Sequence, residues 1–269
     1  MKPILIPPTH HFWSVMDQEY HLILSHLVED PDYFEFYRSE AELGKFLILD
    51  NSAHELGRGQ SIDVLLEQGW SIGAKELVLP DVLYDSTQTV ESTREALEGI
   101  ENFVYSWRPE RVMIVPQGET LEDWMWCFRT MLDDYSRLVS RSRRWVPRLT
   151  VGISKDYNEY PGGLVEILET SVLPAQETIG YDIHLLGWPK PLWDLGSLSR
   201  LYGDRIRTTD SSRPFVYGIA RIRLDTTVEP PPYPGRPEGF FKHRLRRSEF
   251  PAAEHNIKIY KALVSGDLP

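Results

Sequence analysis

The chain has 269 residues, of which 41% are hydrophobic and 26% charged, which is typical of a globular protein. No apolar run reaches the roughly 18–20 residues that a membrane-spanning helix needs, and the single cysteine, Cys127, excludes an intramolecular disulfide and a thiolate zinc site. We therefore expect a cytoplasmic protein that has no membrane contact, no bound metal and no cofactor.

The net charge of −11 is unevenly distributed. Residues 1–136 carry 9 Lys and Arg against 25 Asp and Glu, whereas residues 137–269 carry 20 against 15. The basic residues of the second half concentrate in two segments, 137–148 and 240–250, where aromatic residues lie between them. Such segments suit the phosphates of a nucleic acid, but they are equally compatible with a solvated face that pairs with the acidic half.

Short apolar runs recur along the chain and predict eight strands, at 3–8, 33–38, 45–50, 76–81, 111–118, 148–154, 182–188 and 205–211. Several of them are continuous rather than alternating, as in parallel strands buried on both faces. Helical spacing between them predicts helices at 61–74, 92–107, 121–139 and 162–174. The alternation favours a (β/α)8 TIM barrel over a doubly wound open sheet. Segment 9–44 could also hold two helices and a loop.

The amino-acid composition of the chain changes after about residue 225. Segment 229–239 has five prolines and two glycines, which is typical of a stiff extended connector. A basic segment follows it, and the spacing in 253–264 predicts a closing helix. We expect a barrel domain at 1–228 and a basic C-terminal extension at 229–269 that packs on the barrel.

Polar residues or glycines stand where most of the predicted strands end. They are Asp50, Asp81, Gln117 with Gly118, Gly152, His184 with Gly187, and Asp210. Each is weak alone, because a strand-terminal Asp, Asn51 or Ser52 also caps helices. Because the carboxyl ends of barrel strands share one face, together they predict one active site.

The order of these motifs resembles that of the tRNA-guanine transglycosylase family. The motifs read "LDNSAHE", "VLPDVL", "IVPQG", "VGIS", "HLLGWPK" and "TTDSSRP" across residues 49–214. The chain is most similar to the phage and bacterial branch that places 7-deazaguanines in DNA. The resemblance implies a transferase that exchanges guanine in DNA for a 7-deazaguanine base, such as the 7-cyano form, through a covalent glycosyl-aspartate.

The resemblance also implies a role for each residue. Asp210 matches the nucleophile and Asp50 the general acid and base. The residues implied to bind the base are Asp81, Gln117, Gly118, Gly152, His54, Ser52, His184 and Gly187. The residues predicted to bind nucleic acid are Arg143, Arg144, Arg213, Lys242, Arg244, Arg246 and Arg247.

The resemblance further implies that DNA and a free 7-deazaguanine base are the partners, with a homodimer allowed and the host cell's cytoplasm as the location of a phage-encoded chain. The family's tRNA enzymes hold zinc through three cysteines, so one cysteine implies that the zinc subdomain is missing. Three alternatives stay open: the same exchange on tRNA without zinc, a non-catalytic subunit that binds nucleic acid, and a nucleosidase or unrelated barrel hydrolase.

Overall fold

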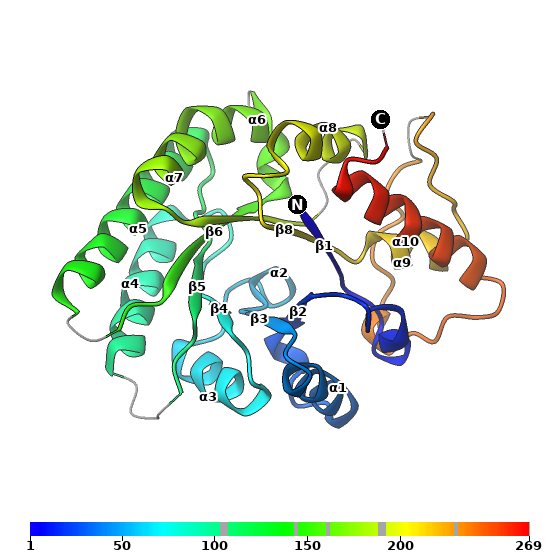
Figure 1. Cartoon of the computed structure of the whole chain (residues 1–269), viewed down its shortest axis with the longest axis horizontal. Coiled ribbons are helices and arrows are strands. Elements are labelled where there is room, and N and C mark those ends of the chain that lie inside the picture. Colours follow the sequence, from blue (N-terminus) through cyan, green and yellow to red (C-terminus); the bar gives the residue numbers. More distant parts are fainter. Residues whose placement is uncertain (103–106, 143–144, 160–161, 188–191, 229–230, 269) are drawn as a thin grey trace. The chain divides into compact units, whose positions relative to one another are not determined.

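The computed structural model describes the chain except for residues 103–106, 143–144, 160–161, 188–191, 229–230 and 269 (Figure 1). It divides into two compact units. The first unit comprises residues 1–21, 154–158 and 183–269, and the second comprises residues 22–153 and 159–182. Each unit is described by itself below.

The strands form a sheet with the order β1-β8-β7-β6-β5-β4-β3-β2. They are β1 (Lys2–Leu5), β2 (Tyr20–Leu24), β3 (Phe46–Asp50), β4 (Glu76–Val78), β5 (Arg111–Ile114), β6 (Arg148–Ser154), β7 (Asp182–Leu186) and β8 (Thr208–Ser211). The fold is the predicted (β/α)8 TIM-like barrel with parallel strands. A doubly wound sheet would reverse its strand order at one point, and this order does not.

Parallel pairing in the second unit runs from β3 to β6, for example Ile48 with Glu76 and Val112 with Leu149. Residues 47–49 are fully buried, as the continuous apolar run predicts. The helices of this unit are α1 (Pro31–Glu42), α2 (Ala53–Leu56), α3 (Ile62–Ile72), α4 (Ser86–Asn102), α5 (Leu121–Arg141), α6 (Gly163–Ile167) and α7 (Leu173–Ile179). A π-helical turn, Leu168–Val172, joins the last two, and Ser25–Leu27 forms a 3-10 turn.

Helix α5 confirms the prediction at 121–139 and extends it by two residues. Thr120 caps its first turn, because the hydroxyl accepts the N–H of Asp123 at 3.1 Å. The buried face carries Trp124 and Phe128, one turn apart and stacked at 5.3 Å between ring centroids. Figure 1 shows α4 and α5 side by side, and each helix has a face of buried residues.

The strand predicted at 33–38 is wrong, because this segment lies inside α1. Asp30 caps the helix by accepting the N–H groups of Asp32 and Tyr33, and Pro31 occupies the first helical position. Tyr33 and Tyr37 lie four residues apart and both are buried. Helical spacing and capping therefore override the preference of aromatic residues for strands, and β2 lies at Tyr20–Leu24 instead.

Two predicted helices differ in detail. In α3, Trp70 was expected on the apolar face, but it is 46% exposed and Gly69 takes the buried position beside it. A Cβ at Gly69 would lie 2.9 Å from the Leu77 side chain, so that face has no room for a larger residue. Helix α4 begins at Ser86, before the predicted start at 92, and the expected apolar positions 103 and 104 lie outside the described residues.

In the first unit, β8 pairs with β1 and with β7. The helices are α8 (Leu192–Tyr202), α9 (Arg213–Ile219) and α10 (Phe250–Ser265), and 3-10 turns occur at Thr9–Ser14, Lys155–Glu159 and Phe240–Lys242. Helix α10 contains the predicted closing helix at 253–264.

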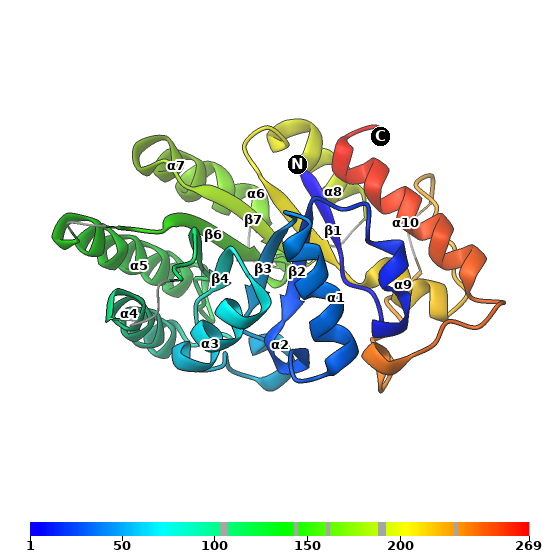
Figure 2. The same cartoon turned by 60° about the horizontal axis from the view of Figure 1, so that its bottom comes forward.

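Helix α10 lies against α9 in both views (Figures 1 and 2). Gly218 permits this contact, because a Cβ there would lie 2.6 Å from the Cβ of Ala253. Tyr260 of α10 also donates its hydroxyl proton to the carbonyl of Thr209 at 2.9 Å, which ties the helix to β8. In the described part of the chain, none of the helices has the length and apolar character that crossing a bilayer requires.

Candidate functional site

The carboxylate of Asp210, on β8, is held at one oxygen only. Its Oδ1 accepts the N–H of Gly187 at 2.9 Å and faces Nε2 of His184 at 3.1 Å. Its Oδ2 has no hydrogen-bond partner among the residues that the structure describes, and the side chain is 9% exposed. Asp210 is therefore fixed in orientation through one oxygen.

His184 helps to orient the carboxylate of Asp210. It is fully buried on β7, and its Cα pairs in register with that of Thr208 on β8. Nδ1 lies 2.7 Å from the hydroxyl of Thr208. A proton on Nε2 satisfies the contact with Asp210, and the hydroxyl of Thr208 can act as donor or acceptor toward Nδ1. His184 was predicted to bind a base, but its ring nitrogens are both used inside the protein.

Lys155 was missed by the sequence analysis although it directly follows β6. Gly187 has a φ of 77°, and a Cβ there would lie 2.7 Å from Cδ of Lys155. The lysine stem therefore packs on the residue whose N–H holds Asp210. Its ammonium group lies 3.2 Å from Asp156. Reading one residue beyond the predicted strand end would have found it.

Arg213 lies three residues after Asp210 and is 8% exposed. Its guanidinium stacks on the ring of Tyr233 at 4.9 Å from the centroid. Burial lowers the pKa of Arg213, and Tyr217, Tyr233 and Asp156 offset part of this effect. Arg213 was predicted among the residues that bind nucleic acid, and unlike Arg246 and Arg247 it is buried.

A second carboxylate cluster lies in the second unit, just beyond β4. Asp81 is 3% exposed, and both of its oxygens accept side-chain amide protons. Asn51 donates to Oδ1 at 2.6 Å and Gln117 donates to Oδ2 at 2.6 Å. The structure thus brings the predicted pair Asp81 and Gln117 together, and it adds Asn51.

Burial raises the pKa of Asp81 from 3.8 to about 6, even though the hydrogen bonds from Asn51 and Gln117 favour its ionised form. Asn51 is fixed as well, because it also donates to the carbonyl of Leu79 at 2.6 Å and accepts the N–H of Ala53 at 2.8 Å. Each polar group in this cluster is directed at another protein group.

Asp50 was predicted to be the general acid and base. It is half-buried at the end of β3, and its Oδ2 accepts the N–H of Ser52 at 2.9 Å. Ser52 has a φ of 60° and is fully buried, with its hydroxyl 2.9 Å from both Ser25 Oγ and His26 Nδ1. His54 lies exposed on α2. Asp50 therefore stabilises a left-handed turn that starts α2.

The two predicted base-binding glycines have different surroundings. Gly118 packs against the start of α5, where a Cβ would lie 2.4 Å from the backbone nitrogen of Trp124. Gly152 lies inside β6 and not at its end, because the strand continues to Ser154. Close packing explains Gly118 without reference to a ligand.

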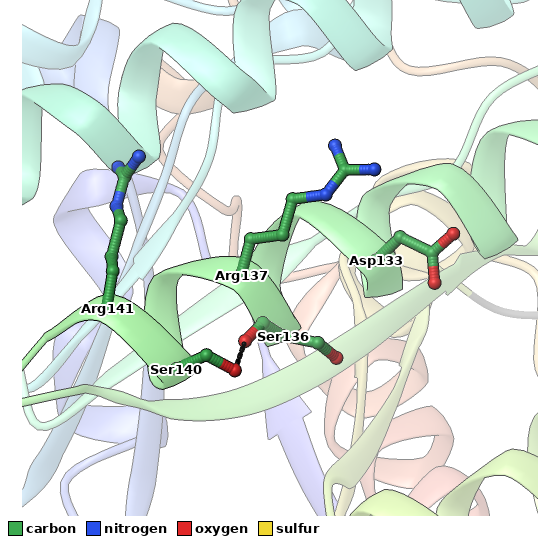
Figure 3. Close-up of a pocket in the computed structure, with 5 residues that line it drawn as sticks. All are labelled: Asp133, Ser136, Arg137, Ser140 and Arg141. Atoms are coloured by element: carbon green, nitrogen blue, oxygen red, sulfur yellow. Dashed lines mark hydrogen bonds between the residues drawn. The ribbon is translucent and has the colours of Figure 1, made fainter.

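The first basic segment overlaps the end of α5, where Arg137 and Arg141 line a surface hollow with Asp133, Ser136 and Ser140 (Figure 3). Arg137 pairs with Asp134 at 3.0 Å and Arg141 with Glu101 at 2.9 Å. These two arginines follow the alternative of a solvated face paired with acidic residues. Arg143 and Arg144 lie outside the described residues.

The second basic segment lies in the first unit and is well exposed. The exposed side chains are those of Lys242, Arg244, Arg246 and Arg247. The backbone beneath them is anchored, since Leu245 donates its N–H to His11 Nε2 at 2.8 Å and Arg246 donates its N–H to Glu249 at 2.7 Å. Binding of nucleic acid by this segment stays a prediction.

No group of three His, Cys, Asp or Glu side chains in the described ranges is arranged to hold a metal ion. Cys127 is buried, and burial raises the pKa of its thiol to about 12. The thiol therefore stays protonated near neutral pH, which does not favour a nucleophile.

Comparison with known proteins finds no matching family model and no matching curated protein. A solved structure described as "Crystal structure of KGPDC from Streptococcus mutans" matches with a TM-score of 0.48 and 11% identity. The match covers 98% of this chain and 99% of that one. At this similarity it concerns the architecture, and no activity is inferred from it.

These findings contradict the assignment to the transglycosylase family and the predicted exchange of guanine for a 7-deazaguanine, since the full-length match is to a differently described barrel. The physical reason is that the motifs are short and stand at strand ends. Any parallel barrel places polar residues and glycines there, in chain order. The alternation of strands and helices therefore predicted the architecture correctly, whereas the motifs did not identify a reaction.

Proposed function

We propose that the chain is an enzyme in which the carboxylate of Asp210 reacts with the substrate. The observation that supports this most is the asymmetry of Asp210: His184 Nε2 and the N–H of Gly187 approach Oδ1, whereas Oδ2 has no hydrogen-bond partner within the described residues. These contacts fix the carboxylate through one oxygen, and they leave the other oxygen oriented to take a proton or to form a bond.

Two features support the same site. Asp210 stands on β8, and in barrel enzymes the reacting groups come from the carboxyl ends of the strands. Lys155 packs on Gly187 and so lies beside the residue that holds Asp210. A carboxyl group and an amino group together can move a proton from and to a substrate.

The test is a substrate screen. The chain is incubated with a deproteinised small-molecule cell extract, and mass spectrometry records which compounds are consumed. Asp210→Asn should abolish every change that the wild type produces, a loss of at least about 10³-fold in rate. Asp204→Asn, an exposed carboxylate of the same unit, is the matched control and should leave turnover intact.

Two results would overturn the proposal: consumption that Asp210→Asn retains, and a wild type that changes no compound in the extract. Intact-protein mass spectrometry during turnover then separates the two chemistries. A covalent adduct that Asp210→Asn lacks indicates a nucleophile, and turnover without an adduct indicates a base.

A further inference from the structure

Arg213 is a largely buried cation, and it forms no ion pair with a carboxylate among the described residues. No acidic side chain of the described residues lies within ion-pair distance of its guanidinium, and its backbone N–H donates to Ser211 Oγ at 3.1 Å. The guanidinium contacts the face of Tyr233, which satisfies none of its five N–H donors. None of its guanidinium nitrogens is both fully buried and unsatisfied, so the group keeps donors that a ligand arriving from solvent can reach.

A second guanidinium reaches the same place from a distant part of the sequence. Arg236 belongs to the proline-rich segment and donates from Nη2 to Ser212 Oγ at 3.3 Å. It also hydrogen-bonds to Tyr233, the residue on which Arg213 stacks. The segment is itself attached to α9, since Tyr217 donates its hydroxyl proton to the carbonyl of Pro231 at 3.1 Å.

Arg236 is held in this position by aromatic rings. Its guanidinium lies 5.5 Å from the ring centroid of Phe240 and 5.2 Å from that of Phe241. Stacked guanidinium groups lose less conformational freedom when they bind a planar or tetrahedral oxyanion.

We propose that Arg213, Arg236 and Ser212 bind a phosphate group of the substrate on which Asp210 acts. Two guanidinium groups and a hydroxyl provide more donors than a carboxylate can accept, and they match the oxygens of a phosphate. The place also fits, since barrel enzymes frequently bind phosphate in the loops after their seventh and eighth strands. The inference rests on the proposed function for its meaning, but the binding can be measured without it.

The experiment is titration calorimetry of the full chain with inorganic phosphate, methyl phosphate, dimethyl phosphate and acetate. The wild type should bind phosphate and methyl phosphate, and Arg213→Gln should weaken both at least about 10-fold. Arg236→Gln should weaken them less, because that side chain is more exposed. Arg223→Gln, an exposed arginine of the same unit with the same change in charge, is the control and should bind like the wild type.

The dimethyl phosphate arm separates two sources of the same group. Tighter binding of methyl phosphate indicates a terminal phosphate on a small molecule, and tighter binding of dimethyl phosphate indicates a diester. Absence of phosphate binding to the wild type, equal binding of acetate, or unchanged binding by Arg213→Gln would each overturn the inference. If Arg213→Gln does not fold, Arg213→Lys keeps the charge, loses the paired N–H donors and should still weaken binding.

Failure here is distinguishable from failure of the proposed function. Asp210→Asn should keep its phosphate binding, because Asp210 makes no contact with the two guanidinium groups. Phosphate binding together with turnover by Asp210→Asn would remove the proposed function alone. Turnover that depends on Asp210 without any phosphate binding would remove this inference alone.

Discussion

The ends of β4 and β8 each carry a nearly buried aspartate, yet the two carboxylates are held in opposite ways. Both oxygens of Asp81 accept protons from rigid amides, those of Asn51 and Gln117. Asp210 is held at one oxygen, by His184 and Gly187, and its other oxygen has no hydrogen-bond partner in the part of the chain that the structure describes. The difference teaches that burial does not by itself mark a reacting group. A carboxylate whose two oxygens both accept hydrogen bonds from the protein stabilises the fold. A carboxylate that is bonded at one oxygen can accept a ligand at the other.

The largest expected effect tests whether Asp81 is structural. Asp81→Ala removes the acceptor of two buried amide donors, and we expect it to lower the free energy of unfolding by about 4 kcal/mol, at ~2 kcal/mol per unsatisfied donor. Asp210→Asn, which keeps an acceptor at Oδ1, should cost less than about 1 kcal/mol. Urea unfolding at pH 5 measures both, and equal losses would break the comparison.

The pH dependence of the free energy of unfolding provides a second test of the role of Asp81. Because the pKa of Asp81 is about 6 in the folded chain and 3.8 in the reference state, the folded state keeps this proton while the unfolded chain loses it. The stabilising contribution of Asp81 is therefore fully present below about pH 4. It decreases as the pH rises between these two pKa values, and the free energy of unfolding stays reduced above about pH 6.

The loss across this window is roughly 3 kcal/mol, at 1.36 kcal/mol for each unit of pKa shift. Asp81→Asn does not titrate, so its stability should change less over the same range. Urea unfolding of both proteins from pH 4 to pH 7 gives the difference. A difference that does not change with pH would mean that Asp81 is ionised throughout.

A smaller effect tests the glycine that follows Gln117. Gly118→Ala should destabilise the chain by about 2 kcal/mol, because the new methyl group would overlap the backbone at the start of α5. Gly99→Ala is the matched control in the same unit, where the methyl group meets only the side chain of Ile62 at 3.1 Å. Thermal unfolding compares them, and equal melting temperatures would remove the packing explanation.

The smallest effect concerns the exposed basic segment of the unit that carries Asp210. If it binds nucleic acid, Lys242→Ala with Arg247→Ala should reduce the salt dependence of binding to a single-stranded oligonucleotide by about one phosphate contact per residue. Lys258→Ala, an exposed lysine of α10, should leave the dependence unchanged. Fluorescence anisotropy across several salt concentrations provides the measurement, and three identical slopes would return these residues to a solvated face.

The sequence alone determined the architecture. Continuous apolar runs such as 47–49 can only be buried on both faces, and their alternation with amphipathic segments such as 121–139 leaves few folds. It also placed Asp81, Gln117, His184 and Asp210 at or near strand ends, because that position is a matter of order along the chain. The strand predicted at 33–38 was wrong, because the aromatic residues of this segment fit a strand preference and a helical spacing equally well.

Only the tertiary structure decided which of these residues is free to act. Asn51 and Gln117 occupy both oxygens of Asp81, and His184, itself in contact with Thr208, fixes one oxygen of Asp210. These side-chain hydrogen bonds join residues that are 24 to 36 positions apart in the sequence. Arg236 likewise reaches Ser212 from a proline-rich segment that reads as a plain connector. Local pattern carries no record of such pairings, because they depend on distances that folding alone sets. The order of residues along the chain determined the barrel architecture. The hydrogen bonds between distant residues determined that Asp81 accepts at both oxygens and that Asp210 is held at one.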